Sequence, residues 1–245
     1  MKALILAAGD GKRLRPLTYT TPKGMIPVNG VPMLVNALSQ IEKIGIKSAV
    51  IVVGHLKEKI YDAIGRKFGG VDITYVENKI YDKTNNVYSL WLARNYLNDD
   101  ALMLECDLFY KENLIGAICS GRSDCDILVS PFDPKTMDGT VVEVDASMKV
   151  KCLTAKQNQG EDYDYSGKLK TVNIYRFSKS FLQDKFLPFI DLYVRTQSVN
   201  SFYELVLGGL VYLGNSDIKA ISVPADWWCE VDAAADLKRA CEMFK

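Results

Sequence analysis

Short aliphatic runs alternate with amphipathic segments through the first half of the chain. Four runs have the length of buried strands, at residues 3–6, 49–53, 72–76 and 101–105. The segments between them predict helices at residues 33–44, 56–67 and 86–98, and in the first of these Leu34, Leu38 and Ile41 fall on one face. Strand and helix in strict alternation indicate a parallel sheet covered by helices on both faces.

The second half of the chain has a mixed pattern. Strands are predicted at residues 126–130, 140–144, 149–153, 171–177 and 218–223, and helices at residues 181–194, 203–213 and 232–244. Residues 157–170 are polar and without periodicity, so we expect a mobile loop or flap there. The simplest organisation is one domain, 1–245, in which residues 126–245 add a mixed β lobe to the parallel half, 1–125.

Composition excludes several classes of protein. The 245 residues are 48% hydrophobic, and 30 basic residues cancel 30 acidic ones, so no overall charge favours nucleic acid or an anionic membrane. No apolar run approaches the roughly 18 residues of a membrane helix, and the first apolar stretch is too short for a signal peptide. The six cysteines show no C-x-x-C spacing, which predicts free thiols in a reducing cytoplasm.

A glycine-rich turn followed by cations comes directly after the first strand. Gly9 and Gly11 let backbone N–H groups approach an anion closely. Four basic residues follow between positions 12 and 23, namely Lys12, Arg13, Arg15 and Lys23. The third glycine of a dinucleotide fingerprint is missing, because Leu14 stands there, and the spacing of a P-loop is absent. The turn therefore predicts a binding site for a triphosphate.

This segment resembles the signature of the nucleotidyltransferase superfamily, L-A-A-G-x-G-x-R-x-x-P-x-T-x-x-x-P-K. Every fixed position is filled, by Leu6, Ala7, Ala8, Gly9, Gly11, Arg13, Pro16, Thr18, Pro22 and Lys23. The resemblance implies an α/β fold with a Rossmann-like, mostly parallel sheet and a nucleotide-binding first half. It also implies nucleotide contacts from Leu6, Ala7, Ala8, Gly9, Gly11 and Lys23, with Arg13 and Lys23 as catalytic cations.

Two aspartates are candidates for a metal site. Asp107 follows the strand at 101–105, where ligands bind in parallel sheets, and Asp232 stands at the predicted start of the last helix. On the residues alone, the alternatives stay open that Asp107 is a loop carboxylate and that Asp232 is an ordinary helix cap. Members of the superfamily carry a metal-binding Asp at both places, so the resemblance implies that Asp107 and Asp232 hold Mg²⁺.

Further segments resemble the cytidylyltransferase branch. Residues 84–90, Thr-Asn-Asn-Val-Tyr-Ser-Leu, are similar to a segment of bacterial phosphocholine cytidylyltransferases, as is the late Trp-Cys-Glu-Val-Asp. This implies CTP as the nucleotide, with Thr84, Asn85 and Ser89 as contacts, although residues of these types also cap helices. Residues 137–142 and 168–177 are similar to cytidylyltransferase domains of phosphonate pathways, which make CMP-2-aminoethylphosphonate and are often fused to another enzyme.

The type of ammonium group on the acceptor is predicted from the residues available to bind it. Choline-handling relatives hold a quaternary ammonium with aromatic faces, but the corresponding region here, 137–140, has no tryptophan. A primary ammonium donates hydrogen bonds, which suits the carboxylates of Asp138, Glu143 or Glu204. The expected acceptor contacts are Lys156 and Lys168 of the flap region, Asn173 on a strand, and the pair Tyr203 and Glu204 on a helix.

We therefore expect a Mg²⁺-dependent cytidylyltransferase that transfers CMP from CTP to 2-aminoethylphosphonate and releases pyrophosphate. The alternatives are a phosphocholine cytidylyltransferase, a sugar-phosphate nucleotidyltransferase and a non-catalytic nucleotide-binding regulator. Whether the chain is one domain of a longer fusion enzyme stays open. His55, Trp227 and Trp228 are expected to have structural roles.

Overall fold

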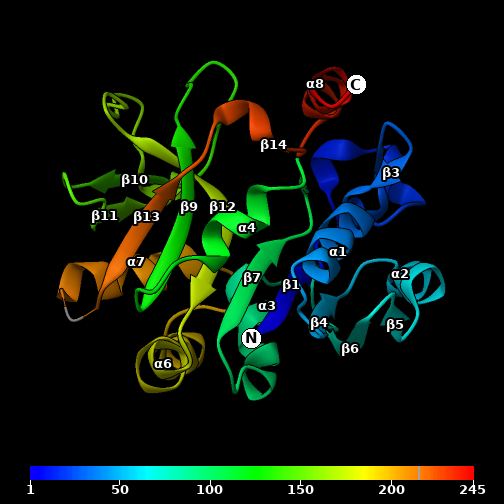
Figure 1. Ribbon diagram of the computed structural model, residues 1–245, viewed down its shortest axis with the longest axis horizontal. Helices are drawn as coiled ribbons and strands as arrows, with labels where there is room; N and C mark the ends of the chain where they lie inside the picture. The colour runs from blue at the N-terminus through cyan, green and yellow to red at the C-terminus, as the bar shows by residue number, and fades with distance from the viewer. Residues whose placement is uncertain (215) are drawn as a thin grey trace.

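A mixed β-sheet with helices on both faces organises the chain (Figure 1), and the computed structural model describes residues 1–214 and 216–245. The strands are β1 (Lys2–Ala7), β2 (Pro27–Val28), β3 (Val31–Pro32), β4 (Ser48–Val53), β5 (Lys67–Phe68), β6 (Val71–Glu77), β7 (Ala101–Glu105), β8 (Leu108–Tyr110), β9 (Cys125–Pro131), β10 (Val141–Val144), β11 (Val150–Thr154), β12 (Leu169–Phe177), β13 (Ile218–Ser222) and β14 (Trp228–Glu230). The helices are α1 (Met33–Lys43), α2 (Lys57–Ile64), α3 (Asn86–Ala93), α4 (Leu114–Cys119), α5 (Lys179–Phe181), α6 (Leu187–Thr196), α7 (Tyr203–Leu213) and α8 (Ala234–Met243).

The main sheet contains ten strands within the described residues, and its central path runs β11-β10-β12-β7-β1-β4-β6-β5. The strands β7, β1, β4 and β6 are parallel, as the alternation of strand and helix predicted. Strand β12 from the second half pairs antiparallel with β7. The opposite edge of β12 pairs with β9, and β9 pairs in turn with β13. The predicted α/β class, a mostly parallel Rossmann-like sheet with a mixed β lobe, is confirmed.

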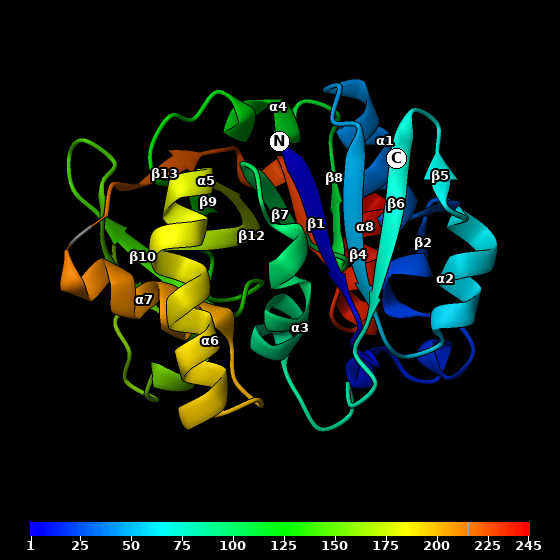
Figure 2. The same cartoon turned by 90° about the horizontal axis from the view of Figure 1, so that it is seen from below.

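Each face of the sheet has its own apolar core because side chains alternate along a strand. On β1, Leu4 and Leu6 pack with α3, α6 and α7, while Ala3 and Ile5 pack with α1, α2 and α4. Figure 2 shows the sheet with α3 and α6 on the near side and α1 behind it. A third, smaller cluster beneath α8 includes Leu14 of the glycine-rich segment.

Several predicted boundaries were wrong. The helix expected at 56–67 ends at Ile64, because Gly65 leaves the helix with φ 70°, and β5 follows. The helix expected at 86–98 ends at Ala93 and continues as a 3₁₀ turn, Arg94–Tyr96. The helix expected at 181–194 is divided into α5, a π-helical turn at Leu182–Phe186, and α6. The short elements α4, β8 and β14 were not predicted.

The predicted flap region has little regular structure. A 3₁₀ turn spans Lys156–Asn158, and β12 begins at Leu169. The side chain of Gln159 donates hydrogen bonds to the carbonyl groups of Gly139 (2.8 Å) and Thr154 (2.9 Å), which tie the start of this segment to the strand region. Its movement over the site stays a prediction.

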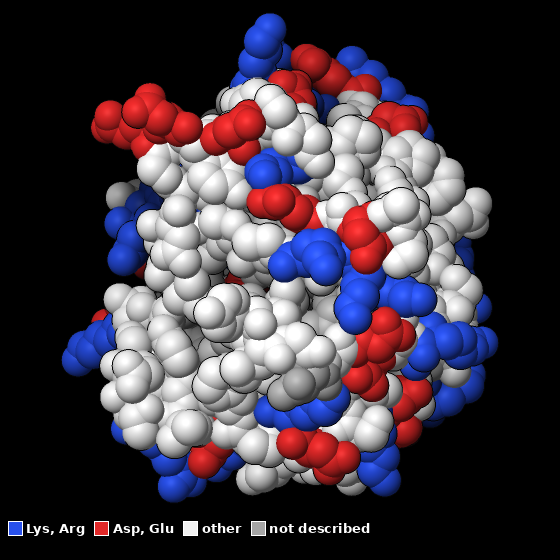
Figure 3. Space-filling view, turned by 90° about the vertical axis from the view of Figure 1, so that its left-hand side faces the viewer, with Lys and Arg blue, Asp and Glu red and all other residues white. Residues whose placement is uncertain are grey.

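The surface agrees with the balanced composition. Figure 3 shows basic and acidic side chains interspersed on the face that carries α7, β10 and β11, beside a broad area without charged groups. All six cysteines are free thiols, as expected. Among the described residues, no helix has both the length and the apolar character needed to cross a membrane.

A buried ion pair fastens β12 to β9, where the mixed half joins the sheet. Arg176 (6% exposed) donates to Asp126 (2% exposed) across 2.8 Å, and also to the carbonyl oxygen of Ser123. Removing one partner of such a pair leaves the other charge buried without compensation, which costs more than the pair itself contributes.

We predict that Arg176→Ala lowers the free energy of unfolding by about 3–5 kcal/mol. The matched control is Lys43→Ala, which breaks an exposed pair with Glu112 and is expected to cost less than about 1 kcal/mol. Urea denaturation followed by circular dichroism measures both. Equal losses in the two variants would show that the Arg176 pair does not stabilise the junction.

Candidate active site

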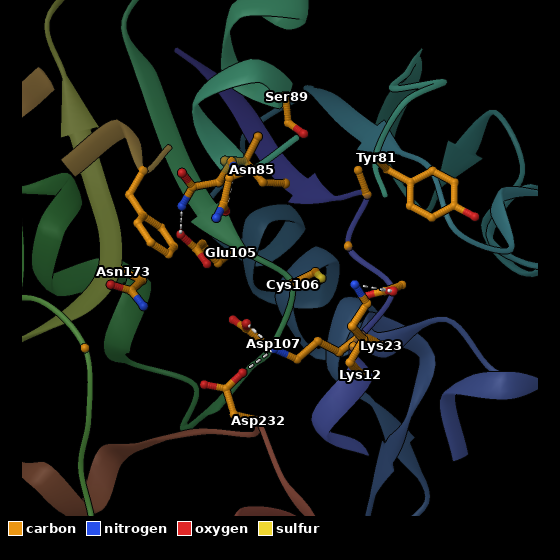
Figure 4. A pocket seen from close by; sticks show the side chains of 18 of the residues that line it. Lys12, Lys23, Tyr81, Asn85, Ser89, Glu105, Cys106, Asp107, Asn173 and Asp232 are labelled. Atoms are coloured by element: carbon orange, nitrogen blue, oxygen red, sulfur yellow. Dashed lines mark hydrogen bonds and ion pairs between the residues drawn. The ribbon is translucent and has the colours of Figure 1, made fainter. Parts of the chain in front are cut away.

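A cavity of about 650 Å³ opens at the carboxyl ends of the parallel strands (Figure 4). It is the place where ligands bind in parallel α/β sheets. Most of the site residues predicted from the sequence line it, namely Leu6, Ala8, Gly9, Gly11, Arg13, Lys23, Thr84, Asn85, Ser89, Asp107, Lys156, Asn173, Glu204 and Asp232. The structure therefore brings the glycine-rich turn, both aspartates and most of the expected acceptor residues together.

Three predicted site residues lie outside the lining of this cavity. Ala7 is buried in the core beside α1, on the opposite face of β1 from Leu6. Lys168 lies outside the cavity lining and forms an ion pair with Glu143 (2.6 Å), which is also absent from the lining. Tyr203 is fully buried and donates a hydrogen bond to Glu105 (2.9 Å), which places it behind the wall.

The ammonium group of Lys23 lies between the two aspartates. Its Nζ is 2.6 Å from Oδ2 of Asp107 and 2.5 Å from Oδ1 of Asp232. Arg13 contacts the other oxygen of Asp232 at 2.9 Å. Burial alone would lower the pKa of Lys23, but the two carboxylates outweigh it and raise this pKa above its usual value. Lys23 and Arg13 in turn hold the pKa of Asp232 below its usual range, against the effect of burial.

A short β-ladder brings the aspartates together. Strand β14 pairs antiparallel with β8, and the N–H of Val231 donates to the carbonyl oxygen of Asp107 (2.8 Å). The cap of α8 is Ala233, and the Asp236 carboxylate accepts the N–H groups of Asp232 and Ala233. Asp232 therefore does not cap the helix, and its own carboxylate faces Lys23 and Arg13.

The glycine-rich turn requires glycine at one position. Gly11 has φ +59°, and a Cβ there would lie 2.9 Å from the Thr18 methyl and 3.3 Å from Cβ of Lys23. The hydroxyl of Thr18 donates to the carbonyl of Gly11 (3.0 Å), and His55 Nε2 lies 2.8 Å from the carbonyl oxygen of Thr18. The contact of His55 is with the backbone, in line with the structural role expected for it.

A buried amide organises the wall that carries Thr84, Asn85 and Ser89. Asn78 is 1% exposed, and its Nδ2 donates to the hydroxyl oxygens of Thr84 (2.9 Å) and Ser89 (3.2 Å). Asn85 caps α3, because its Oδ1 accepts the N–H of Asn86. These polar groups combine a local structural role with a position on the cavity surface.

The prediction missed two carboxylates in the cavity wall, Glu105 and Glu230. Asn86 Nδ2 bridges Glu105 (3.2 Å) and Glu204 (3.4 Å), and neither carboxylate makes an ion pair with any described residue. Burial raises the pKa of Glu204 to about 7 and that of Glu105 well above its usual value. The sequence signal was a glutamate at the last position of a buried strand, where an aliphatic residue is expected.

Glu230, in contrast, has a cation. Lys170, which is 1% exposed, lies 3.2 Å from Glu230 Oε2, and Asn173 Nδ2 donates to Oε1 at 3.0 Å. Asn173 has φ +59° and lies where the pairing of β12 with β9 shifts register, between Thr171 and Tyr175. This irregularity places Asn173 in the cavity wall, 3.0 Å from Glu230.

The residues present fit a Mg²⁺ ion. Asp107 Oδ1 is buried and accepts no hydrogen bond from the described residues, so one lone-pair site of this carboxylate has no partner. The described residues contain no cluster of three or more potential metal ligands, and Asp107 and Asp232 would contribute two carboxylates. Mg²⁺ usually takes one or two carboxylates and completes its shell with water and substrate phosphates.

Comparisons with known proteins agree with this geometry. Residues 2–177 match the family described as nucleotidyl transferase. The chain is 30% identical over 241 residues to a CMP-5'-(3-aminopropyl)phosphonate synthase of Streptomyces rubellomurinus, which covers 98% of this chain and 38% of that protein. It is 37% identical over 114 residues to a 2-aminoethylphosphonate cytidylyltransferase of Lancefieldella rimae, which covers 46% and 45% of the two proteins.

A solved structure, a CTP:phosphocholine cytidylyltransferase from Streptococcus pneumoniae, has the same fold. It matches with a TM-score of 0.81 at 23% identity and covers 100% of this chain and 99% of that one. The alignments thus cover less than half the length of the two curated relatives above, whereas the structural match covers 99% of the solved neighbour. The match over residues 2–177, with a complete glycine-rich signature at the cavity, shows that this chain belongs to the nucleotidyl transferase family.

Proposed function

We propose that the protein transfers CMP from CTP to a short aminoalkyl phosphonate, with 2-aminoethylphosphonate as the expected acceptor. The observation that carries the proposal is the cluster of Lys23, Arg13, Asp107 and Asp232 beside the glycine-rich turn. A phosphonate oxygen attacks the α-phosphorus and forms a P–O–P bond. The bond from the α-phosphorus to the bridging oxygen breaks, and pyrophosphate leaves with its electron pair.

The chain's own residues supply positioning and charge. A phosphonate is largely anionic near pH 7, so the nucleophile needs orientation rather than a general base. Negative charge accumulates around the α-phosphorus and on the leaving pyrophosphate, and preorganised cations stabilise it. We assign the α-phosphate to Lys23 and the leaving group to Arg13. Bound Mg²⁺, held by Asp107 and Asp232, would supply further neutralisation of phosphate charge.

The opposite wall of the cavity supports an acceptor with a primary ammonium. Glu105 and Glu204 share one neutral donor, Asn86, Glu105 also accepts a hydrogen bond from Tyr203, and neither glutamate forms an ion pair with a described residue. An ammonium group would add charge-assisted hydrogen bonds to these glutamates and would favour their ionised forms. Of the aromatic residues described in the lining, only Tyr81 and Phe202 are present, which is a poor match to an aromatic cage for a quaternary ammonium.

The names of the relatives favour the same class of acceptor. One is a CMP-5'-(3-aminopropyl)phosphonate synthase and another a 2-aminoethylphosphonate cytidylyltransferase. Both names refer to a short alkyl phosphonate that carries a primary amine. The phosphocholine cytidylyltransferase is similar in fold, which makes phosphocholine the principal alternative acceptor.

Pyrophosphate release, measured across four nucleoside triphosphates and a panel of acceptors, tests the proposal. We expect the highest kcat/KM with CTP and 2-aminoethylphosphonate, and measurable turnover of 3-aminopropylphosphonate. A higher kcat/KM with UTP or dTTP would overturn the assignment of the nucleotide. Release with none of the acceptors would overturn the proposed reaction as a whole.

Asp107→Asn and Asp232→Asn are each predicted to reduce kcat by at least about 10²-fold at ordinary Mg²⁺ concentrations, because each removes a negative oxygen ligand. Asp226→Asn is the matched control, since this exposed aspartate pairs with Lys111 away from the cavity cluster. Circular dichroism checks that the variants fold. Near-wild-type kcat in either cavity variant would remove that aspartate from the proposed metal site.

The discrimination between acceptors is predicted to depend on Glu204. Hydrogen bonds to a charged group contribute about 1.5–3 kcal/mol, which corresponds to about ten- to a hundredfold in kcat/KM. We expect 2-aminoethylphosphonate to exceed phosphocholine by that factor in the wild type, and Glu204→Gln to narrow the difference. Glu143→Gln is the control, because Glu143 pairs with Lys168 outside the cavity. Equal or faster turnover of phosphocholine by the wild type would favour the alternative acceptor.

A further inference from the structure

Lys23 occupies the space between the two carboxylates that would hold the metal. Figure 4 shows Asp107 and Asp232 both pointing at the end of the Lys23 side chain. The ammonium nitrogen lies 2.6 Å from one carboxylate and 2.5 Å from the other, distances at which a single cation bridges both. A metal ion held by the same two oxygens would compete with this nitrogen for them.

The charges of this cluster are already balanced inside the protein. Lys23 and Arg13 supply two positive charges, and Asp107 and Asp232 supply two negative ones. A divalent cation approaching the free protein therefore meets an ammonium group in place of two uncompensated carboxylates. Coulomb repulsion between the metal and Lys23 is strong because the Lys23 side chain is only 12% exposed.

The base of the Lys23 side chain is fixed by packing, while its ammonium group could reach a phosphate bound at the glycine-rich turn. The Cβ and Cγ atoms of Lys23 pack against Gly11, where a Cβ would lie 3.3 Å from each of them. This contact anchors the base of the side chain beside the glycine-rich turn, where phosphates are expected. The four-carbon stem of a lysine allows its ammonium to turn from a carboxylate to a phosphate without movement of the backbone.

We propose that Lys23 is the occupant of the metal position in the nucleotide-free protein and that it exchanges with the metal when a nucleotide enters. The triphosphate supplies the ammonium with a new anionic partner, and the carboxylates are then free to hold the ion. Asp107 Oδ1, buried and without a hydrogen-bond partner among the described residues, retains a site for that ion. The metal accordingly binds with the nucleotide and not before it. This inference rests on the proposed metal role of Asp107 and Asp232.

Metal binding without nucleotide tests the exchange directly. Titration of Mn²⁺ followed by electron paramagnetic resonance gives the affinity of the wild type, of Lys23→Gln, which removes the charge, and of Lys23→Arg, which keeps it. We expect Lys23→Gln to bind Mn²⁺ at least about tenfold more tightly than the wild type, because the competing cation is gone. Lys23→Arg should stay within a few-fold of the wild type, and Lys111→Ala, an exposed lysine outside the cluster, should match it.

A second measurement serves if Lys23→Gln folds poorly, since its two buried carboxylates then repel each other. In that case Mg²⁺ alone should raise the Tm of Lys23→Gln while leaving that of the wild type unchanged. The double variant Lys23→Gln, Asp107→Asn should lose the gain in Mn²⁺ affinity.

Equal Mn²⁺ affinity in the wild type and Lys23→Gln, whether tight or absent, would overturn the exchange. None of these readouts uses CTP, so loss of the proposed reaction is recognised separately, in the pyrophosphate assay.

Discussion

The site depends on one ion-pair cluster, in which the ammonium of Lys23 holds Asp107 and Asp232 at 2.6 and 2.5 Å. Two like charges this close and this buried would repel each other strongly without a cation between them. The cluster also joins three distant segments of the chain, namely the segment after β1, the turn between β7 and β8, and Asp232, two residues after β14. The same charged groups therefore hold these segments together and line the cavity where the reaction is proposed.

The cavity separates two kinds of charged wall. Arg13 and Lys23 in the lining are placed to neutralise phosphate, and Glu105 and Glu204, also in the lining, form no ion pair with a described residue. An acceptor that carries a phosphonate at one end and an ammonium at the other matches this division.

Local patterns predicted what local interactions determine. The aliphatic runs predicted the parallel strands β1, β4 and β7, because burial on both faces requires continuous apolar residues, whereas β6 has exposed residues at Asp72 and Thr74. The glycine-rich signature placed Gly11, Arg13 and Lys23 in the cavity because its geometry is set within a few residues. The β8–β14 ladder was missed because each strand is only three residues long and its partner is distant in sequence. Asn173 was predicted only from the resemblance, since its positive φ arises from a register shift between two strands.

The most direct test of the cluster as the centre of phosphate chemistry is the position of a metal ion in crystals. An anomalous difference map from crystals grown with Mn²⁺ and a non-hydrolysable CTP analogue locates that ion without reference to activity. We expect a peak between the carboxylates of Asp107 and Asp232, with Lys23 Nζ turned toward a phosphate oxygen. A peak away from both carboxylates, with Lys23 still bridging them while the analogue is bound, would contradict it.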